Sequence, residues 1–297
     1  MTLPEGPHGG DGPAVARALG LDPASLLDLS QSLNPFAPDV AGLAARHLDS
    51  LQRYPELAAG ERSLAHAIGV PSDRLVLTNG GAHAIALVAA ELGGTVRAEP
   101  EFSLHPRSDT GPRWRSNPHN PTGVLAAPDE RADVWDEAFY PLAAGTWTRG
   151  DDGVTVVGSL TKVFACPGLR LGFALASGAD EAEALRRRRP EWSVNSLALA
   201  MLDDLLAATD LPRWRRGIAA QRDKLGALLR DHGFEPEPSD AVWLLVKAPG
   251  LRERLAPRGV LVRGCSSFGL PDHVRIAVPD DRGIDHLARA LERSHAA

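Results

Sequence analysis

The chain is short of cysteine, of positive charge and of long apolar runs, and each shortage excludes a class of protein. Its two cysteines, Cys166 and Cys265, lie far apart and form no CxxC pair, so neither a disulfide scaffold nor a zinc site is expected. No stretch approaches the ~18 apolar residues that a membrane span needs. The Gly- and Pro-rich residues 1–20 lack the apolar core of a signal peptide. We therefore expect a cytoplasmic protein that binds no metal and no membrane.

The formal net charge of -6 at pH 7 argues against a nucleic acid as the main partner. The one basic run, Arg186–Arg189, is interpreted as the solvated end of a helix that stops before Pro190. Lysine is the scarcest basic residue, since only Lys162, Lys224 and Lys247 occur. Chemistry that needs an amine nucleophile therefore has three candidates.

Short apolar runs alternate with helix-forming segments along the 297 residues, a length that allows a large domain and a smaller one. Residues 74–78 form the first such run, Asn79-Gly-Gly81 follows, and residues 82–92 are strongly helix-forming. A strand, a glycine turn and a helix in this order direct backbone N–H groups at a phosphate. Further strands are predicted at 95–98, 154–158 and 171–176. Such runs indicate an α/β protein whose sheet is covered by helices.

Helices are predicted at 61–68, 180–189, 195–208 and, long and amphipathic, at 213–232. The C-terminal part of the chain has a different order of elements. Beyond these we predict strands at 241–247, 260–263 and 273–278, with helices at 251–255 and 284–293. This order indicates a smaller C-terminal α/β domain. We predict an N-terminal arm (1–35) that contributes to the active site, a large domain (36–205) and a small domain (206–297).

Lys162 has neighbours that suit a reactive lysine. Ser159 and Thr161 carry hydroxyl groups, and Arg170 follows eight residues later. A lysine must be activated by its surroundings to act as a nucleophile at neutral pH, and an arginine fork suits a phosphate. Taken alone the S-x-T-K pattern is weak, and a solvent-facing lysine after a strand would be the commoner explanation.

Two further motifs precede this lysine, Asn117-Pro-His-Asn-Pro-Thr-Gly123 and Trp135-Asp-Glu-Ala-Phe139. Together with the segment Ser159–Arg170, in this order and spacing, they resemble the fold-type I pyridoxal-5′-phosphate (PLP) enzymes of aminotransferase class I/II. The resemblance covers nearly the whole chain. It implies a mainly parallel central sheet in a large three-layer domain, a smaller C-terminal α/β domain, and a homodimer with active sites at the subunit interface.

The resemblance also assigns roles. Lys162 would bind PLP covalently and catalyse proton transfer, and Asp136 would pair with the pyridine nitrogen, where a carboxylate keeps the ring cationic. For Asp136 the plainer alternative is a helix cap or turn residue. The other implied cofactor contacts are Gly81, Ala82, His105, Asn120, Ser159, Thr161, Arg170 and Tyr54.

For three of these residues the resemblance implies which part of the cofactor they contact. Asn120 would bind the phenolate oxygen, and His105 would take the stacking position over the ring, with Phe102 as the alternative if the register differs. Tyr54 would reach the phosphate from the partner subunit. Its alternative is a packed tyrosine before a proline.

Several short motifs resemble the threonine-phosphate decarboxylases of cobalamin biosynthesis, which are close relatives of histidinol-phosphate aminotransferases. They are His8-Gly-Gly-Asp11, Ser32-Leu-Asn-Pro35, Arg53-Tyr-Pro55 and Trp192-Ser-Val-Asn195. In that group Arg275 corresponds to the arginine that clamps the substrate carboxylate. Arg263, with His8 and Asn34, would help to hold the substrate, including its phosphate, although Arg263 could equally be a surface arginine at the end of a strand.

The expected activity is therefore PLP-dependent decarboxylation of a phosphorylated amino acid such as L-threonine O-3-phosphate. One alternative is an aminotransferase of the histidinol-phosphate type, and another is a degenerate member that binds PLP with little or no turnover. The first two differ only in which bond at the substrate Cα stands perpendicular to the ring, and the motif resemblance alone favours decarboxylation. A plain nucleotide-binding domain has only the Asn79-Gly-Gly81 turn in its favour.

The middle of the chain is shorter than the family pattern. Only residues 106–116 separate His105 from the Asn117 motif, and little more than one turn and a short strand fit between Gly123 and Asp136. We therefore expect at least one helix and a strand of the usual large domain to be missing. Ser239-Asp-Ala-Val-Trp243 also has Val-Trp where relatives often have Asn-Phe, which removes one substrate contact.

Overall fold

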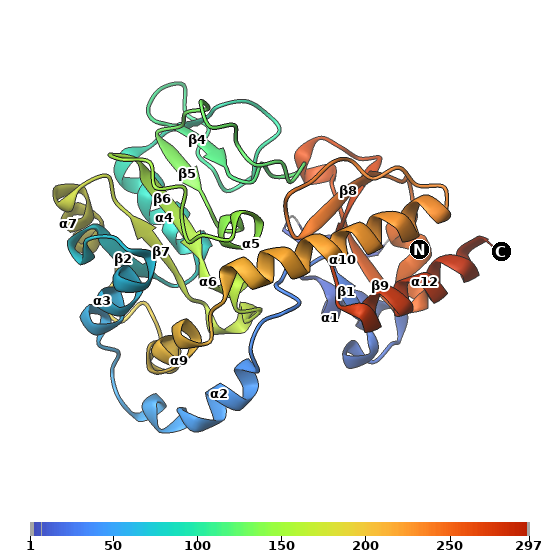
Figure 1. Cartoon of the computed structure of the whole chain (residues 1–297), viewed down its shortest axis with the longest axis horizontal. Helices are drawn as coiled ribbons and strands as arrows, with labels where there is room; N and C mark the ends of the chain where they lie inside the picture. Colours follow the sequence, from blue (N-terminus) through green and yellow to red (C-terminus); the bar gives the residue numbers. More distant parts are fainter. Residues whose placement is uncertain (1–2, 7, 296–297) are drawn as a thin grey trace.

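The computed structural model describes residues 3–6 and 8–295, which form two sheets and the helices around them (Figure 1). The larger sheet has the strand order β2-β7-β6-β5-β4-β3. Strands β3 to β6 run parallel, and β7 is antiparallel to both of its neighbours. The sheet is therefore mainly parallel, as predicted. Its strands are β2 (Leu75–Thr78), β3 (Thr95–Val96), β4 (Arg113–Ser116), β5 (Val134–Asp136), β6 (Thr155–Ser159) and β7 (Gly172–Leu175).

Helices cover both faces of the larger sheet. Val134 of β5 belongs to a core shared with helices α4 and α7, whereas the next residue, Trp135, belongs to a core shared with α3, α5 and α9. Successive strand residues point to opposite faces, so this part of the molecule has three layers. The helices are α3 (Leu57–Ile68), α4 (Gly81–Leu92), α5 (Tyr140–Ala144), α7 (Ala179–Arg188) and α9 (Leu202–Ala207).

The second sheet combines both ends of the chain. Its order is β1-β9-β10-β8, with β1 parallel to β9 and the other pairs antiparallel. The strands are β1 (Leu27–Leu29), β8 (Trp243–Lys247), β9 (Val260–Gly264) and β10 (His273–Ala277). The sequence analysis predicted β8, β9 and β10 but no strand at residues 27–29. The predicted domain boundaries after residues 35 and 205 remain a prediction.

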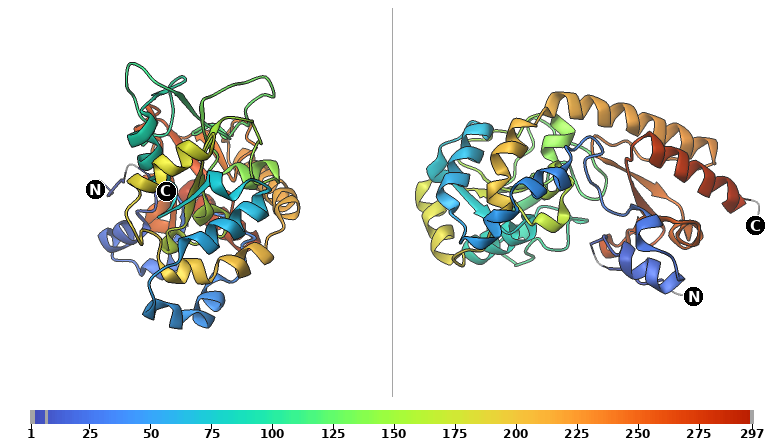
Figure 2. Two further views of the ribbon diagram at one scale, coloured as in Figure 1. Left: turned by 90° about the vertical axis from the view of Figure 1, so that its left-hand side faces the viewer. Right: turned by 90° about the horizontal axis from the view of Figure 1, so that it is seen from below.

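The long helix α10 (Leu211–Asp231) runs alongside both sheets and joins the two lobes that Figure 2 shows from below. It packs against α5 on one side and against α12 and β8 on the other. The remaining helices are α1 (Gly12–Leu19), α2 (Val40–Arg46), α6 (Leu160–Val163), α8 (Ser196–Ala200), α11 (Leu251–Leu255) and α12 (Asp281–His295). The predicted helix at 195–208 is thus two helices, α8 and α9.

The middle of the chain, which is shorter than the family pattern, also lacks helices in the structure. Residues 97–112, between β3 and β4, and residues 117–133, between β4 and β5, contain no helix. Both segments run as loops above the sheet (Figure 1). Among the helices that the structure describes, none is long and apolar enough to cross a membrane.

Candidate active site

A cavity of about 270 Å³ opens between the two lobes. From the larger sheet it is lined by the residues that end β5 and β6 and by the start of α4, where ligands of parallel sheets commonly bind. From the second sheet it is lined by side chains of β9 and β10. Most of the predicted site residues line it: His8, Gly81, Ala82, Asn120, Asp136, Ser159, Thr161, Lys162, Arg170, Arg263 and Arg275.

Lys162 is the lysine of this cavity. It lies on α6, one turn after β6 ends, and Lys224 and Lys247 lie elsewhere on the surface. Burial, with a smaller contribution from the charges of three arginines, lowers the pKa of the Lys162 amine to about 8, although the carboxylate of Asp136 acts in the opposite direction. A larger fraction of this amine is therefore neutral, and nucleophilic, at neutral pH than for a free lysine.

The start of α4 faces Arg170 and Ser159 and forms a cradle for an anion. Gly80 has φ +80, and a Cβ there would lie 2.3 Å from Nη2 of Arg170. A side chain at this position would therefore fill the space that the guanidinium occupies. The first N–H groups of the helix, at Gly81 and Ala82, have no intrahelical partner, and Oγ of Ser159 lies 2.7 Å from Oγ1 of Thr161 at the same end of the cavity. These donors suit a phosphate group.

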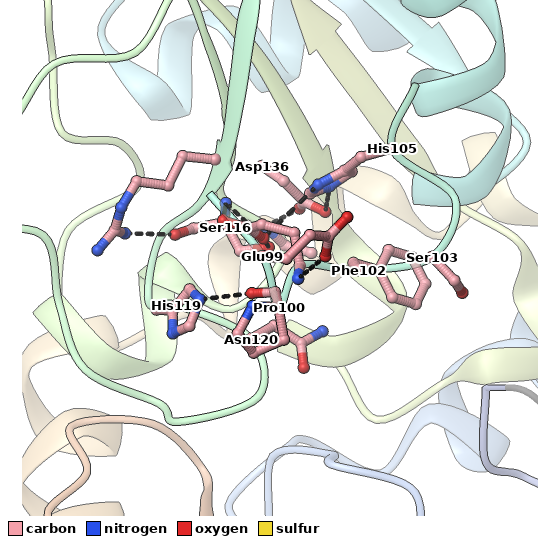
Figure 3. A network of polar contacts seen from close by, with 12 residues as sticks. Glu99, Pro100, Phe102, Ser103, His105, Ser116, His119, Asn120 and Asp136 are labelled. Carbon is pink, nitrogen blue, oxygen red and sulfur yellow. Dashed lines mark hydrogen bonds and ion pairs between the residues drawn. The ribbon is translucent and has the colours of Figure 1, made fainter. Parts of the chain in front are cut away.

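Asp136 ends β5 with its carboxylate at the cavity and is held from two sides (Figure 3). Its Oδ1 accepts a hydrogen bond from the N–H of Ala138 at 3.0 Å, and its Oδ2 lies 2.9 Å from Nε2 of His105. His105 is fully buried behind Asp136 and does not line the cavity. Phe102 lines it instead. Of the two alternatives for the stacking position, the geometry therefore favours Phe102 and corrects the placement of His105.

Arg275, on β10, is a buried cation at the other wall. Its Nη1 donates to Oδ1 of Asn120 at 2.6 Å, and its Nη2 donates to Oγ of Ser32 at 2.7 Å. The guanidinium lies 4.1 Å from the ring centroid of Trp243, and Nε has no hydrogen-bond partner among the described residues. Burial lowers the pKa of Arg275, and the charge of Arg263 lowers it further. Such a group is stabilised by an anion in the cavity.

Besides His105, two predicted site residues do not line this cavity, Asn34 and Tyr54. The amide of Asn34 donates to the carbonyl of Val163 at 2.9 Å and accepts from the N–H of Phe36, so it holds the backbone beside Lys162 instead of lining the cavity. Tyr54 is 79% exposed, and its ring packs on that of Trp192, with 4.7 Å between centroids.

Ser32 was missed as a site residue, although it opens the motif Ser32–Pro35 that sequence reasoning singled out. The resemblance implied Asn34 as the site residue of this motif, yet the hydroxyl of Ser32 is the group that contacts Arg275. Glu101, which directly follows the cis Glu99–Pro100 bond, gave no sequence signal and is buried beside His105.

The residues present fit PLP. The cavity brings together an amine with a lowered pKa, a carboxylate at one end, a glycine cradle with Arg170 at the other, and an aromatic ring from Phe102 between them. Each of these groups matches a different part of the cofactor: the aldehyde, the pyridine nitrogen, the phosphate and the ring face.

A family model described as "Aminotransferase class I and II" matches residues 114–291. Histidinol-phosphate aminotransferase 1 of Dechloromonas aromatica is 27% identical over 341 aligned residues, which cover 94% of this chain and 93% of the relative. Two solved structures have the same fold. The histidinol-phosphate aminotransferase of Sinorhizobium meliloti, in complex with PLP, has a TM-score of 0.79 and 18% identity, covering 99% of this chain and 95% of that one. L-threonine-O-3-phosphate decarboxylase of Porphyromonas gingivalis has a TM-score of 0.75 and 22% identity, covering 92% and 100%.

Proposed function

Because the chain belongs to the aminotransferase class I and II family, whose cofactor is PLP, we propose that it transfers the amino group of a phosphorylated substrate of the histidinol-phosphate type. The observation that carries the proposal is the presence of one lysine, Lys162, and two buried arginines, Arg263 and Arg275, in a single cavity. Amino transfer from a phosphorylated amine to a 2-oxo acid needs a base at Cα and cations for the anionic ends. The curated relatives support this activity over the decarboxylation that the motifs predicted.

When bound, PLP takes up the substrate amine covalently and withdraws electrons from Cα. Lys162 then acts as the base that removes the Cα proton and as the acid that returns a proton, a double role that suits a group whose pKa of about 8 is close to neutral. Asp136, fixed by His105 and Ala138, holds a negative charge at the pyridine nitrogen. Phe102, which lines the cavity, would pack against the face of the cofactor ring.

Arg275 and Arg263 divide the binding of the substrate. Arg275, aligned by Asn120 and Ser32, presents its guanidinium fork to the carboxylate of the 2-oxo acid that accepts the amino group. Arg263 lies on β9 beside the N-terminal segment with His8. Burial lowers the pKa of His8, and the charge of Arg263 lowers it further. The part of the cavity beside Arg263 and His8 therefore suits the substrate phosphate better than the part beside Arg275.

A second subunit completes the site in this proposal. Leu48, Leu51, Tyr54 and Trp192 are large apolar side chains that are more than half exposed. Exposed apolar groups gathered in one region mark interaction surfaces. In a homodimer formed through these residues, Tyr54 reaches the phosphate cradle of the partner subunit.

Decarboxylation of a phosphorylated amino acid is the second candidate, and one observation favours it. The segment His8-Gly-Gly10, part of the motif that resembles the threonine-phosphate decarboxylases, lines the cavity. Gly9 has φ +75, and a Cβ there would lie 2.7 Å from the carbonyl oxygen of Ser30. The segment therefore depends on glycine to stay beside Arg263.

The deciding experiment measures both products with the purified protein loaded with PLP. Histidinol phosphate and a 2-oxo acid should yield the corresponding amino acid, and the Lys162→Ala variant should yield none. Carbon dioxide from L-threonine O-3-phosphate without amino transfer would reject the proposal in favour of decarboxylation. Tight PLP binding without either product would favour a family member that does not turn over.

A further inference from the structure

His105 stands between two buried carboxylates, those of Asp136 and Glu101. Its Nε2 lies at hydrogen-bond distance, 2.9 Å, from Oδ2 of Asp136. Its Nδ1 has no hydrogen-bond partner among the described residues and lies at ion-pair distance, 3.7 Å, from Oε2 of Glu101. The exposed fractions of the side chains are 0% for His105, 1% for Glu101 and 9% for Asp136. Neutral imidazole can donate from only one nitrogen, whereas imidazolium donates from both. A carboxylate on each side therefore favours the imidazolium form.

Glu101 is held by Ser116, at the end of β4. Its Oε2 accepts a hydrogen bond from the Ser116 hydroxyl at 2.7 Å, and the Ser116 N–H lies 3.1 Å from Oε1. Donors of this kind favour the ionised carboxylate. Burial raises the pKa of Glu101, while His105 and Ser116 lower it in part. A buried negative charge needs a cation nearby, and among the described residues His105 is the ion-pair partner of Glu101.

Arg107 fixes the backbone that carries both side chains. Its guanidinium donates to the carbonyl of Glu101 at 3.2 Å and to that of His105 at 2.8 Å. It also pairs with Glu99, whose carboxylate oxygen lies 2.7 Å from Nε of Arg107. The loop therefore holds Glu101 and His105 in one relative orientation although it contains no helix.

We propose that Glu101 is a positioning residue: it holds a proton on Nδ1 of His105, so that His105 meets Asp136 as an imidazolium ion and aims the Asp136 carboxylate at the cofactor ring. Without a negative group on that side, a single proton on Nε2 would satisfy Asp136 and leave His105 neutral. The three groups together carry two negative charges and one positive charge. The surplus negative charge lies where the cationic pyridine nitrogen is proposed to bind.

This inference rests on the proposed role of Asp136 but not on the identity of the amino substrate. Nitrogen-15 NMR of the full chain without cofactor tests it directly, with the His105→Asn variant to assign the signals. At neutral pH, His105 of the wild type should carry a proton on both ring nitrogens. Glu101→Gln should lose the proton on Nδ1 and keep the one on Nε2.

Asp109→Asn is the matched control, because it likewise replaces a carboxylate by its amide in the same loop, on an exposed side chain that takes no part in the hydrogen bonds of Arg107. Both His105 protons should remain in this variant. A single ring proton on His105 of the wild type would overturn the proposal, whether or not the variants fold. Two ring protons in folded Glu101→Gln would overturn it as well.

PLP affinity gives the second readout. Glu101→Gln should bind PLP about tenfold more weakly, the loss typical when a residue that orients a ligand-binding group is removed, and Asp109→Asn should bind it as the wild type does. Equal affinity in Glu101→Gln and wild type would show that Glu101 does not act on the cofactor. Absence of amino transfer in a wild type with two His105 protons would reject the proposed function and leave this inference standing.

Discussion

Arg275 and Asn120 join the two sheets at the cavity through a hydrogen bond of 2.6 Å between Nη1 and Oδ1. Arg275 belongs to β10 of the second sheet, whereas Asn120 lies in the loop that follows β4 of the larger sheet. The same guanidinium also bonds to Ser32, just after β1. Three separate parts of the chain therefore meet at the side chain of Arg275. We expect substitutions of Arg275 to weaken substrate binding more than they lower the stability of the fold.

Arg275→Lys should lower kcat/KM for the 2-oxo acid about 100-fold, or about 3 kcal/mol. Lysine keeps the charge but has no planar fork to bind a carboxylate at two points. Steady-state kinetics at varied concentration of the 2-oxo acid measure the effect. The control is Arg222→Lys, because Arg222 bonds to the carbonyls of Asp240 and Ala241 outside the cavity. A loss of similar size in that control would contradict the proposed role of Arg275.

The rate at which the cofactor-free protein takes up PLP should rise with pH through about 8 and level off above it. Only the neutral amine of Lys162 can attack the aldehyde, and below its pKa the amine is protonated. Arg275→Met removes a positive charge that lowers the pKa of Lys162, so the midpoint should move to higher pH. Stopped-flow absorbance across pH measures both midpoints, and an unchanged midpoint would mean that the arginine charge does not act on Lys162.

Gly80→Ala should abolish tight PLP binding and destabilise the fold. Its φ of +80 strains any other residue, and the new Cβ would meet Arg170 at 2.3 Å. Gly69→Ala is the matched control, because Gly69 has φ +84 and a Cβ added there would have no neighbour within 4 Å. Both should lose about 1–3 kcal/mol of stability through backbone strain. Only Gly80→Ala should lose PLP, as equilibrium dialysis would show.

Phe102→Ala should weaken PLP binding by about 1 kcal/mol or more, because an aromatic ring beside the cofactor contributes that much beyond its buried area. Phe102→Tyr should bind PLP nearly as the wild type does. Fluorescence titration of the cofactor-free proteins compares them. If His105 stacked on the ring, Phe102→Ala would bind PLP normally.

Trp192→Glu should convert the proposed dimer into a monomer and, as a result, weaken PLP binding. Burying a carboxylate in the apolar patch of Leu48, Leu51, Tyr54 and Trp192 is unfavourable. Dissociation of the dimer removes the partner's Tyr54 from the phosphate cradle. Sedimentation at several concentrations reports the assembly. Val124→Glu, at an apolar side chain that is 43% exposed outside this patch, should leave it intact. A monomeric wild type would refute this arrangement.

Much of the larger sheet could be predicted from sequence because its strands are short apolar runs. The runs around Val76, Val157 and Ala174 each appear as strands within one or two residues of their predicted ends. Strand β1 could not be predicted, because Leu27–Leu29 alternates apolar and acidic residues over only three positions. Its pairing with β9 depends on tertiary structure, which three residues cannot encode.

The placement of Lys162, Asp136 and Arg170 in one cavity follows from motifs whose spacing is tightly constrained. For His105, the spacing of the motifs is not sufficient to predict whether the side chain faces the cavity. Its N–H bonds to the carbonyl of Phe102 at 3.0 Å, so the chain turns between the two residues. The turn sends Phe102 into the cavity and His105 behind Asp136, and a linear alignment cannot distinguish the two directions.

The pairing of β1 with β9 sets an order in which the protein can fold during synthesis. Residues 27–29 leave the ribosome long before their partners at 260–262 are made. The strands of the larger sheet, residues 75–175, are complete well before that. The larger lobe can therefore fold first, at a stage when β1 has no partner strand yet. Shortening the chain at its C-terminus would leave β1 without a neighbour and remove one wall of the cavity.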